Sequence, residues 1–373
     1  MRILHLITSL ETGGAQGVLV RLLSRHVRQG VTARVVTLLD GGALAADVRE
    51  LGVAVAGLSM RRGRPSLSGA LRFLGQVRKF RPDVVQTWLY HADLLGLLSL
   101  LCRPRPKLVW GVRCANMELG RLTGWTLGLL ARFSRLPDAV ATNSQAAKAH
   151  HLALGYRPRE FAVIPNGFDL AAFRPDPAAR AGLRMELGAG AAPLVGLVGR
   201  FDPMKDIRTF CRMAGQVRAA DPAVRFLLCG PGLDAANREL AGWIGEAGIG
   251  GAVLLLGERR DVARVYAALD VFVCSSRGES FANVLGEAMS CGLACVSTDA
   301  GDADLILGGC GRIAPAGDAG GLARAVLGLL ALPEEERREL GRRARERVGN
   351  LFSLERAAEA FLELYARLAG RAS

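Results

Sequence analysis

Apolar segments with strand character alternate with helical segments along the whole chain, and this alternation constrains the fold more than any other feature. In the first half, strands are predicted at residues 3–7, 33–38, 53–56, 84–87, 109–112, 139–142 and 162–164. Helices are predicted between them at 15–29 and 67–80. Repeated strand–helix order indicates a parallel sheet covered by helices, so the predicted fold class is α/β.

A second series of the same kind follows an interruption at residues 174–177, where two prolines flank an aspartate. Its strands are predicted at 194–198, 224–229, 253–256, 271–274 and 294–298. The chain has 373 residues, which is more than one typical core holds and enough for two domains. We therefore expect two doubly wound domains at residues 1–168 and 190–350, with a linker around 168–190 and a last helix at 354–368.

Two carboxylates stand eight positions apart near the end of the second series. Glu279 follows the strand at 271–274, and Glu287 lies in a short helix predicted at 283–290. The first N–H groups of a helix have no partner inside it, so they attract phosphate. Glu279 would lie beside such a phosphate, and Glu287 would accept hydrogen bonds from ribose hydroxyls. The alternative is that both glutamates only solvate a helix.

Two cations follow the first strand of the second series. Arg200 and Lys205 stand on a loop that begins at Gly199. Arginine offers a planar fork of donors and lysine a mobile point charge, so the pair can neutralise a leaving nucleoside diphosphate without a metal ion. The alternative is that both only solvate the surface.

On these residues the chain resembles the retaining glycosyltransferases of family 4, and the resemblance covers nearly the whole chain. Glu279 to Glu287 fits the family's Glu-x7-Glu motif, Arg200 and Lys205 fit its diphosphate-binding pair, and Gly-Gly-Ala-Gln at 13–16 fits its donor loop. Residues 280–282 are Ser-Phe-Ala where members often have Gly-Phe-Pro, a change that affects only the backbone shape of that loop. The resemblance implies a GT-B fold of two facing Rossmann-like domains with an interdomain cleft. It also implies that residues 354–373 pack back on the N-terminal, acceptor-side domain, while 190–350 bind the nucleotide sugar.

The resemblance further implies roles for individual residues. The expected catalytic residues are Glu279, His91, Arg200 and Lys205. The expected donor-binding residues are Gly13, Gly14, Ala15, Gln16, Gly199, Arg259, Phe281, Ala282, Asn283, Val284 and Glu287. Arg113 and Asn116 are expected on the acceptor side. Without the resemblance, His91 would read as structural, as a lone histidine after a buried strand usually is.

No metal ion or other cofactor is expected. Asp-Ala-Asp at 302–304 spells the triplet by which many other glycosyltransferases hold a divalent metal. We discount it, because Arg200 and Lys205 already take the electrostatic role of a metal and a three-residue pattern recurs by chance.

The expected activity is the retaining transfer of a sugar from a nucleoside diphosphate sugar, first of all a UDP-sugar, to an envelope glycan or lipid-linked acceptor. GDP-mannose is the alternative donor. A sugar-nucleotide 2-epimerase would share the architecture, but the five histidines of the chain supply its chemistry poorly. A non-catalytic nucleotide-binding module is a third alternative, and it need not retain Glu279.

The basic charge of the chain lies in its first half. Residues 1–168 hold 23 Lys and Arg against 9 Asp and Glu, whereas the remainder hold 25 against 26. This asymmetry indicates an anionic partner for the first domain, either a membrane surface or nucleic acid, unless it only reflects an Arg-rich composition. No nucleic acid is expected, because the sequence lacks zinc-finger spacing, RNP-like strands and basic zippers. The segments at 60–74 and 119–133 combine Arg with large apolar residues, as interfacial helices do.

We expect no targeting signal in this sequence. No apolar run is long enough for a transmembrane helix, and the first residues read as a strand rather than a signal peptide. We expect a cytoplasmic protein, peripheral on the cytoplasmic face of the inner membrane. The eight cysteines form no Cys-x-x-Cys pair and are expected to be reduced and buried.

Overall fold

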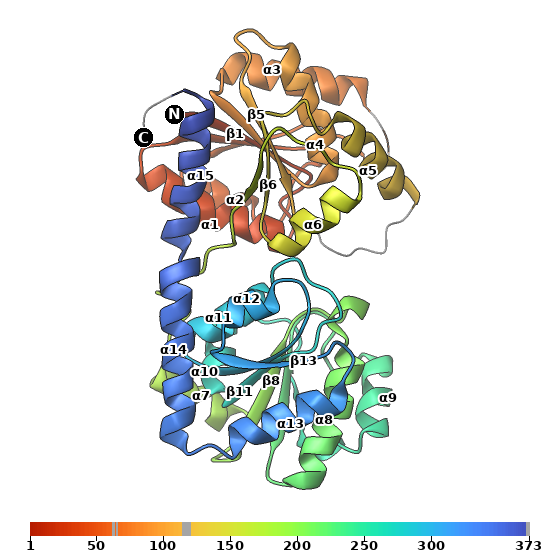
Figure 1. The fold of residues 1–373 in the computed structure, drawn as a ribbon, viewed down its shortest axis with the longest axis vertical. Coiled ribbons are helices and arrows are strands. Elements are labelled where there is room, and N and C mark those ends of the chain that lie inside the picture. The colour runs from red at the N-terminus through yellow and green to blue at the C-terminus, as the bar shows by residue number, and fades with distance from the viewer. Residues whose placement is uncertain (62–63, 65, 114–120, 371–373) are drawn as a thin grey trace. The chain divides into compact units, whose positions relative to one another are not determined.

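The computed structural model describes all residues except 62–63, 65, 114–120 and 371–373. The chain divides into two compact units (Figure 1). Unit 1 comprises Met1–Gly167 together with Leu354–Ser373, and unit 2 comprises Phe168–Ser353. Each unit therefore has its own sheet and its own apolar core.

Unit 1 is built on a parallel sheet whose strand order is β3-β2-β1-β4-β5-β6-β7. The strands are β1 Arg2–Ile7, β2 Thr32–Thr37, β3 Ala54–Gly57, β4 Val84–Trp88, β5 Lys107–Val112, β6 Ala139–Thr142 and β7 Phe161–Val163. All residues of β4 are buried, as expected for a central strand with helices on both faces. The strand order reverses between β1 and β4, which pair directly.

The helices of unit 1 cover both faces of this sheet. They are α1 Gly14–Arg28, α2 Ala45–Glu50, α3 Leu67–Phe80, α4 Tyr90–Gly96, α5 Arg121–Phe133, α6 Gln145–Ala153 and α15 Leu354–Leu368. A short 3-10 helix, Leu97–Leu101, follows α4. The apolar faces of the helices pack on the sheet in two clusters, one of which includes residues of α1 and α15.

Helix α15 joins unit 1 although it is separated from it in sequence by the whole of unit 2. It packs beside α1, where Arg25 Nε lies 2.9 Å from Glu355 Oε1 and His26 Nε2 lies 3.1 Å from the carbonyl oxygen of Ala358 (Figure 1). Tyr365 donates its O–H to Gln86 Oε1 of β4 over 2.9 Å. The last helix is therefore part of the core of unit 1.

Unit 2 repeats the design with the strand order β10-β9-β8-β11-β12-β13, all parallel. The strands are β8 Leu194–Val198, β9 Arg225–Cys229, β10 Val253–Leu255, β11 Val271–Cys274, β12 Ala294–Thr298 and β13 Gly311–Ala314. The α-helices are α7 Pro177–Glu186, α8 Ile207–Ala220, α9 Arg238–Glu246, α10 Val262–Ala268, α11 Asn283–Ser290, α12 Ala303–Leu307, α13 Ala319–Leu330 and α14 Glu334–Phe352. Here the order reverses between β8 and β11.

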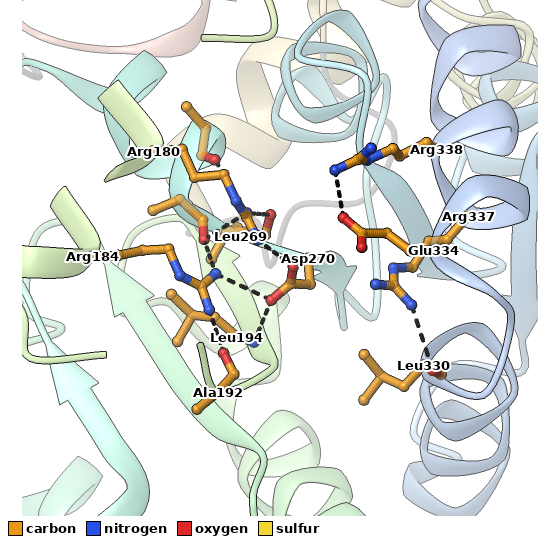
Figure 2. Close-up of polar contacts among 12 residues, drawn as sticks. Arg180, Arg184, Ala192, Leu194, Leu269, Asp270, Leu330, Glu334, Arg337 and Arg338 are labelled. Carbon is orange, nitrogen blue, oxygen red and sulfur yellow. Dashed lines mark hydrogen bonds and ion pairs between the residues drawn. The ribbon is translucent and has the colours of Figure 1, made fainter. Parts of the chain in front are cut away.

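Helix α7 occupies the segment that the sequence suggests as a linker. Arg180 and Arg184 on this helix reach Asp270, which lies one residue before β11, at 2.6 and 3.2 Å (Figure 2). The backbone N–H of Leu194, the first residue of β8, donates to the same carboxylate over 2.7 Å. Both arginines also donate to carbonyl oxygens, among them that of Ala268. These bonds fix α7 to the amino ends of β8 and β11.

The predicted fold class, two doubly wound α/β domains, is confirmed. The helices predicted at 67–80 and 283–290 coincide with α3 and α11, and most predicted strands agree to within a residue at their ends. The structure adds α7 and the edge strand β13, which the apolar pattern did not reveal. Among the residues that the structure describes, no helix is both long and apolar enough to cross a membrane.

Candidate functional site

The residues predicted for the site follow strands that lie next to each other where the sheet order reverses. In unit 2, the loop after β8 carries Arg200 and Lys205, and the loop after its neighbour β11 carries Glu279. In unit 1, residues 13–16 follow β1, and His91 follows its neighbour β4. Ligands of doubly wound sheets bind at the carboxyl ends of strands at such a reversal, so each unit places its predicted residues at the expected position.

The loop after β8 starts with a close approach between two strands. The N–H of Gly199 donates to the carbonyl oxygen of Cys229 over 2.9 Å. Gly230 has φ +143°, and a Cβ there would lie 1.9 Å from the carbonyl oxygen of Gly199. Glycine is therefore required opposite Gly199. The Arg200 side chain that follows is 63% exposed, with Nη2 3.5 Å from Asp202 Oδ2.

Lys205 and Glu279 are brought together from the two loops. Lys205 Nζ forms an ion pair with Glu279 Oε1, and the two side chains are only 21% and 13% exposed. Ser276 donates its hydroxyl to the same oxygen over 2.8 Å. Burial disfavours the charged form of Lys205, but the charge of Glu279 outweighs it, so the pKa of the lysine is raised. Lys205 is therefore an ammonium ion at neutral pH.

Asp206 links the two loops, and sequence reasoning missed it. Its buried carboxylate accepts hydrogen bonds from the hydroxyl of Thr209 at 2.8 Å and from Nε of Arg277 at 2.7 Å. Two further bonds join the loops: the backbone N–H of Arg277 donates to the carbonyl oxygen of Met204, and the Ser275 hydroxyl donates to the carbonyl oxygen of Lys205. The signal that could have identified Asp206 is its place before a helical run, where aspartate caps N–H groups.

Gly301 supports the acidic loop from β12 and was also missed. It has φ +61°, and a Cβ at this position would lie 2.2 Å from the carbonyl oxygen of Glu279. Any other residue would therefore displace the backbone that carries this glutamate. No local sequence signal predicts this, because the contact joins segments more than twenty residues apart.

Helix α11 begins at Asn283, directly after the acidic loop. Ala282 at its N-cap makes no side-chain hydrogen bond to the first turn. Asn283 and Val284 are partly exposed. About one turn into this helix, Glu287 accepts a hydrogen bond from the buried Tyr266 hydroxyl over 3.0 Å. The helix thus presents N–H groups at its start and an oriented carboxylate further along.

Three of the residues expected to bind donor are engaged elsewhere. Phe281 is buried, with its ring stacked on Phe168 at a centroid distance of 6.1 Å, and Ala282 is buried as well. Only their backbone can therefore meet a ligand. Arg259 forms a fork with Asp261 at 2.8 and 2.7 Å and also contacts Glu186 at 3.2 Å. The hydrogen bonds from Arg259 lower the pKa of Asp261 to about 2, so this cluster stays ionised.

The glycine-rich segment of unit 1 forms the start of α1. Gly13 is the N-cap in extended conformation, and the helix begins at Gly14 without a side-chain cap. Ala15 and Gln16 complete the first turn and are partly exposed. The first N–H groups of a fifteen-residue helix therefore lie at the carboxyl end of β1.

The other predicted residues of unit 1 follow β4 and β5. His91 is exposed in the first turn of α4. The guanidinium carbon of Arg113 lies 4.3 Å from the centre of the buried Trp88 ring, and its Nη1 donates to Asn166 Oδ1 over 2.5 Å. This contact holds Arg113 against the end of β4. Asn116 lies outside the described residues.

Metal-ligating side chains are not clustered in the part of the chain that the structure describes. No group of three or more His, Cys, Asp or Glu there could hold a metal ion. Asp302 and Asp304 both lie at the start of α12, where the first is buried and the second exposed.

Comparison with known proteins identifies related chains. Residues 12–172 match the model of a family described as Glycosyltransferase Family 4, and residues 192–331 match one described as Glycosyl transferases group 1. A lipopolysaccharide core biosynthesis mannosyltransferase from Rhizobium leguminosarum bv. viciae is 30% identical over 74% of this chain and 83% of its own length. A GDP-mannose-dependent alpha-mannosyltransferase from Mycobacterium tuberculosis is 33% identical over 62% of this chain. This chain spans only 59% of the length of that relative.

A solved structure has the same fold over the whole chain. It is the crystal structure of Anabaena HepE in complex with UDP, which superposes with a TM-score of 0.87. The match covers 98% of this chain and 100% of HepE at 24% sequence identity. The fold of this chain is therefore one that is known from a solved structure.

Proposed function

Because this chain belongs to glycosyltransferase family 4, we propose that it transfers a sugar, with retention of configuration, from a nucleoside diphosphate sugar to an envelope glycan or lipid-linked acceptor. The observation that carries this proposal is the Lys205–Glu279 pair between the loops after β8 and β11. It places a cation, a carboxylate and the start of α11 in one part of unit 2. Anionic diphosphate fits such a combination.

In the proposed complex, Lys205 Nζ, Arg200 and the first N–H groups of α11 hold the diphosphate. Negative charge on this group grows as the sugar leaves it, and fixed donors stabilise that charge. Glu279 orients the ammonium group of Lys205, while Ser276 fixes the carboxylate. Glu287, itself oriented by Tyr266, accepts hydrogen bonds from ribose hydroxyls.

The transfer step forms and breaks bonds on one face of the sugar. The bond between the anomeric carbon and the phosphate oxygen breaks, and a bond from that carbon to the acceptor oxygen forms on the same face. The proton of the acceptor hydroxyl passes to the departing phosphate oxygen. We place His91 of unit 1 beside the donor sugar in this reaction, as a hydrogen-bonding group.

We propose two candidate donors, a UDP-sugar and GDP-mannose, and the names of the relatives favour GDP-mannose. The UDP-sugar predicted from the sequence stays a prediction. The Mycobacterium tuberculosis relative is a GDP-mannose-dependent enzyme, and the Rhizobium leguminosarum relative is a mannosyltransferase. These names support GDP-mannose as the second candidate, which would make this chain a mannosyltransferase.

Ligand-induced stabilisation tests the proposal, because a ligand that binds the folded state raises the unfolding temperature. The protein is titrated with UDP, GDP and ADP and with their sugar conjugates, and transfer is followed by release of the diphosphate. Stabilisation by UDP but not GDP supports the first donor, and the reverse supports GDP-mannose. If no nucleoside diphosphate stabilises the protein, the proposed function is wrong.

A matched pair of variants ties the result to the site. Glu279→Gln removes the charge that orients Lys205 and should abolish most transfer. Glu246→Gln removes an exposed glutamate that pairs with Arg208 on the surface of unit 2 and should leave transfer unchanged. Equal activity in the two variants would remove the Lys205–Glu279 pair from the mechanism.

A further inference from the structure

The backbone at Leu89, between β4 and α4, is in a conformation that side chains other than glycine rarely adopt. Its φ and ψ are +73° and +156°. Such a conformation is strained and persists only where the surroundings hold it. The N–H of Leu89 donates to the carbonyl oxygen of Gly111 in β5 over 3.0 Å. Two residues later comes His91, so the strained turn sets the direction in which α4 presents this histidine.

Asp93 ties the same turn to both neighbouring strands from inside the protein. This residue of α4 has no exposed surface. Its Oδ1 accepts hydrogen bonds from the hydroxyl of Thr87 in β4 and, over 3.2 Å, from the N–H of Gly111 in β5. The N–H of Asp93 in turn donates to the carbonyl oxygen of Leu89 over 3.0 Å. One side chain therefore connects the helix that carries His91 to the strands on either side of it.

The contact between β4 and β5 at Gly111 leaves no room for a side chain. A Cβ at Gly111 would lie 2.3 Å from the carbonyl oxygen of Thr87, so the two strands approach as closely as glycine allows. Burial raises the pKa of Asp93 to about 7, although both hydrogen bonds oppose this shift. Oδ2 has no hydrogen-bond partner in the part of the chain that the structure describes. A buried carboxyl group with one unsatisfied oxygen destabilises the folded protein, and an apolar residue at position 93 would destabilise it less. Packing alone therefore does not explain an aspartate at this position.

We propose that Asp93 is a positioning residue for the transfer reaction: by bonding Thr87 and Gly111 it holds the strained turn at Leu89 and so fixes His91. The inference rests on the proposed role of His91 beside the donor sugar. Asp93 itself is buried and touches no substrate. Its effect on catalysis passes through the orientation of α4.

The test compares turnover in the single and double variants. His91→Ala and Asp93→Ala should each lower kcat, the second by up to about 100-fold, the loss that a small misplacement of a reacting group causes. The double variant should be no slower than His91→Ala, because effects that pass through one group do not add. Asp93→Asn keeps the acceptor for Thr87 and Gly111 and should restore most of kcat, with KM for the donor little changed.

A control variant separates positioning from stability. Val48→Ala shortens a buried side chain of α2, away from this turn, and should lower the unfolding temperature without changing kcat. Losses in kcat that multiply in the double variant, or an Asp93→Asn enzyme as slow as Asp93→Ala, would overturn the inference. If His91→Ala alone leaves kcat unchanged in an active enzyme, the proposed role of His91 is wrong. Losses that multiply in the double variant would instead reject only the positioning role of Asp93.

Discussion

At the scale of single residues, the pairing of Lys205 with Glu279 assigns different duties to the two cations of the site. Lys205 is mostly buried and held by a carboxylate, whereas Arg200 is 63% exposed and lies 3.5 Å from Asp202. The charge of Lys205 is already oriented, so it can stabilise the leaving group without any rearrangement of the side chain. The Arg200 side chain is exposed and must first move to meet the ligand. The two cations are thus expected to act at different stages of the same reaction.

We predict that Lys205→Ala lowers kcat by on the order of 100-fold, more than it weakens binding of the nucleoside diphosphate. Arg200→Ala should lower kcat less. Steady-state kinetics and calorimetric titration with the diphosphate give the two quantities. Arg208→Ala, which removes an exposed arginine paired with Glu246, is the matched control and should change neither. Equal losses in kcat and in affinity for Lys205→Ala would indicate simple anchoring.

A second prediction at this scale concerns His26, which is buried between α1 and α15. Burial lowers the pKa of His26 from 6.5 to about 4, although the hydrogen bond to Ala358 opposes the shift. Between these values the unfolded chain binds the proton and the folded chain does not. The contribution of neutral His26 to the free energy of unfolding is therefore fully present above pH 6.5. It is lost as the pH falls towards 4, by up to about 1.4 kcal/mol per pH unit.

Urea unfolding at pH 7.5 and pH 5 measures this effect. His26→Gln should reduce the loss of unfolding free energy between the two pH values. The control is Ser68→Ala, which changes an exposed residue of α3 that does not titrate and should leave the pH dependence as in the unchanged protein. An identical pH dependence in His26→Gln would show that this histidine is not neutral in the folded state.

At the scale of elements, a cluster of ion pairs and hydrogen bonds in unit 2 lies at the opposite end of the sheet from the site. Asp270 binds Arg180, Arg184 and the N–H of Leu194 at the amino ends of β8 and β11 (Figure 2). The residues of the site follow the carboxyl ends of the same strands. Stability and chemistry therefore depend on different ends of two central strands.

We predict that Asp270→Ala lowers the unfolding free energy by about 3 kcal/mol or more, because it leaves two arginines without their buried partner. Nucleoside diphosphate binding to the folded protein should be unchanged. Glu334→Gln breaks the exposed Glu334–Arg338 pair on α14 and is the matched control, with an expected change below about 1 kcal/mol (Figure 2). Denaturant unfolding of both variants checks this, and equal losses would contradict it.

Helix α3 carries the prediction of membrane contact. It packs Phe73 and Val77 on the sheet but leaves Leu67 and Leu71 exposed, at 79% and 59%. Arg61, Arg64, Arg72, Arg78 and Lys79 are exposed on or near it. Large apolar side chains beside basic ones fit an anionic bilayer surface.

We predict that the protein sediments with vesicles that contain anionic lipid and is released by salt, because screening weakens the attraction. Leu67→Glu with Leu71→Glu should abolish binding. Met185→Glu changes a residue of unit 2 that is 82% exposed and should have no effect. If the unchanged protein does not bind such vesicles at low salt, the basic charge of the first half is a matter of composition. The second segment expected to contact membrane, 119–133, falls partly outside the described residues.

Much of the fold and of the candidate site could be predicted from the sequence. The features that could not be predicted depend on contacts between distant segments of the chain. Strands and the helix at 283–290 follow from local apolar patterns, and the motif spacing placed Glu279 and Lys205 at neighbouring strand ends. Helix α7 was read as linker because its anchor, Asp270, lies about ninety residues away. The role of Gly301 depends on a contact between two loops, which no local pattern encodes. Asp206 carries a local signal as a helix cap, but its bond to Arg277 in the other loop does not follow from that signal. Phe281 was predicted to bind the donor; its ring packs on Phe168 in the core, so this prediction now concerns its backbone alone.

At the scale of the whole molecule, the two units carry different charges and different parts of the expected reaction. The family membership and the fold predicted from the sequence are confirmed by the comparisons. The excess of basic residues lies entirely in residues 1–168, whereas the Lys205–Glu279 pair lies in unit 2. Attraction to an anionic surface and stabilisation of a leaving diphosphate are thus assigned to separate units.

We predict that transfer persists after exhaustive treatment with EDTA, because Lys205, Arg200 and the start of α11 supply the positive charge for the diphosphate. The measurement is diphosphate release before and after chelation, with magnesium or manganese added back. Activity that disappears with EDTA and returns with metal would make Asp302 and Asp304 ligand candidates, and Asp304→Asn would then be the next variant.

The return of α15 to unit 1 sets the order in which the chain can fold as it is synthesised. Phe361, Leu364 and Tyr365 belong to the apolar cluster of the first sheet, yet the ribosome makes them after all of unit 2. The apolar core of unit 1 therefore stays incomplete until α15 has been synthesised. Residues 168–353, in contrast, emerge as one continuous stretch that can fold without interruption. During this interval the apolar face of α1 that α15 later covers stays exposed to water.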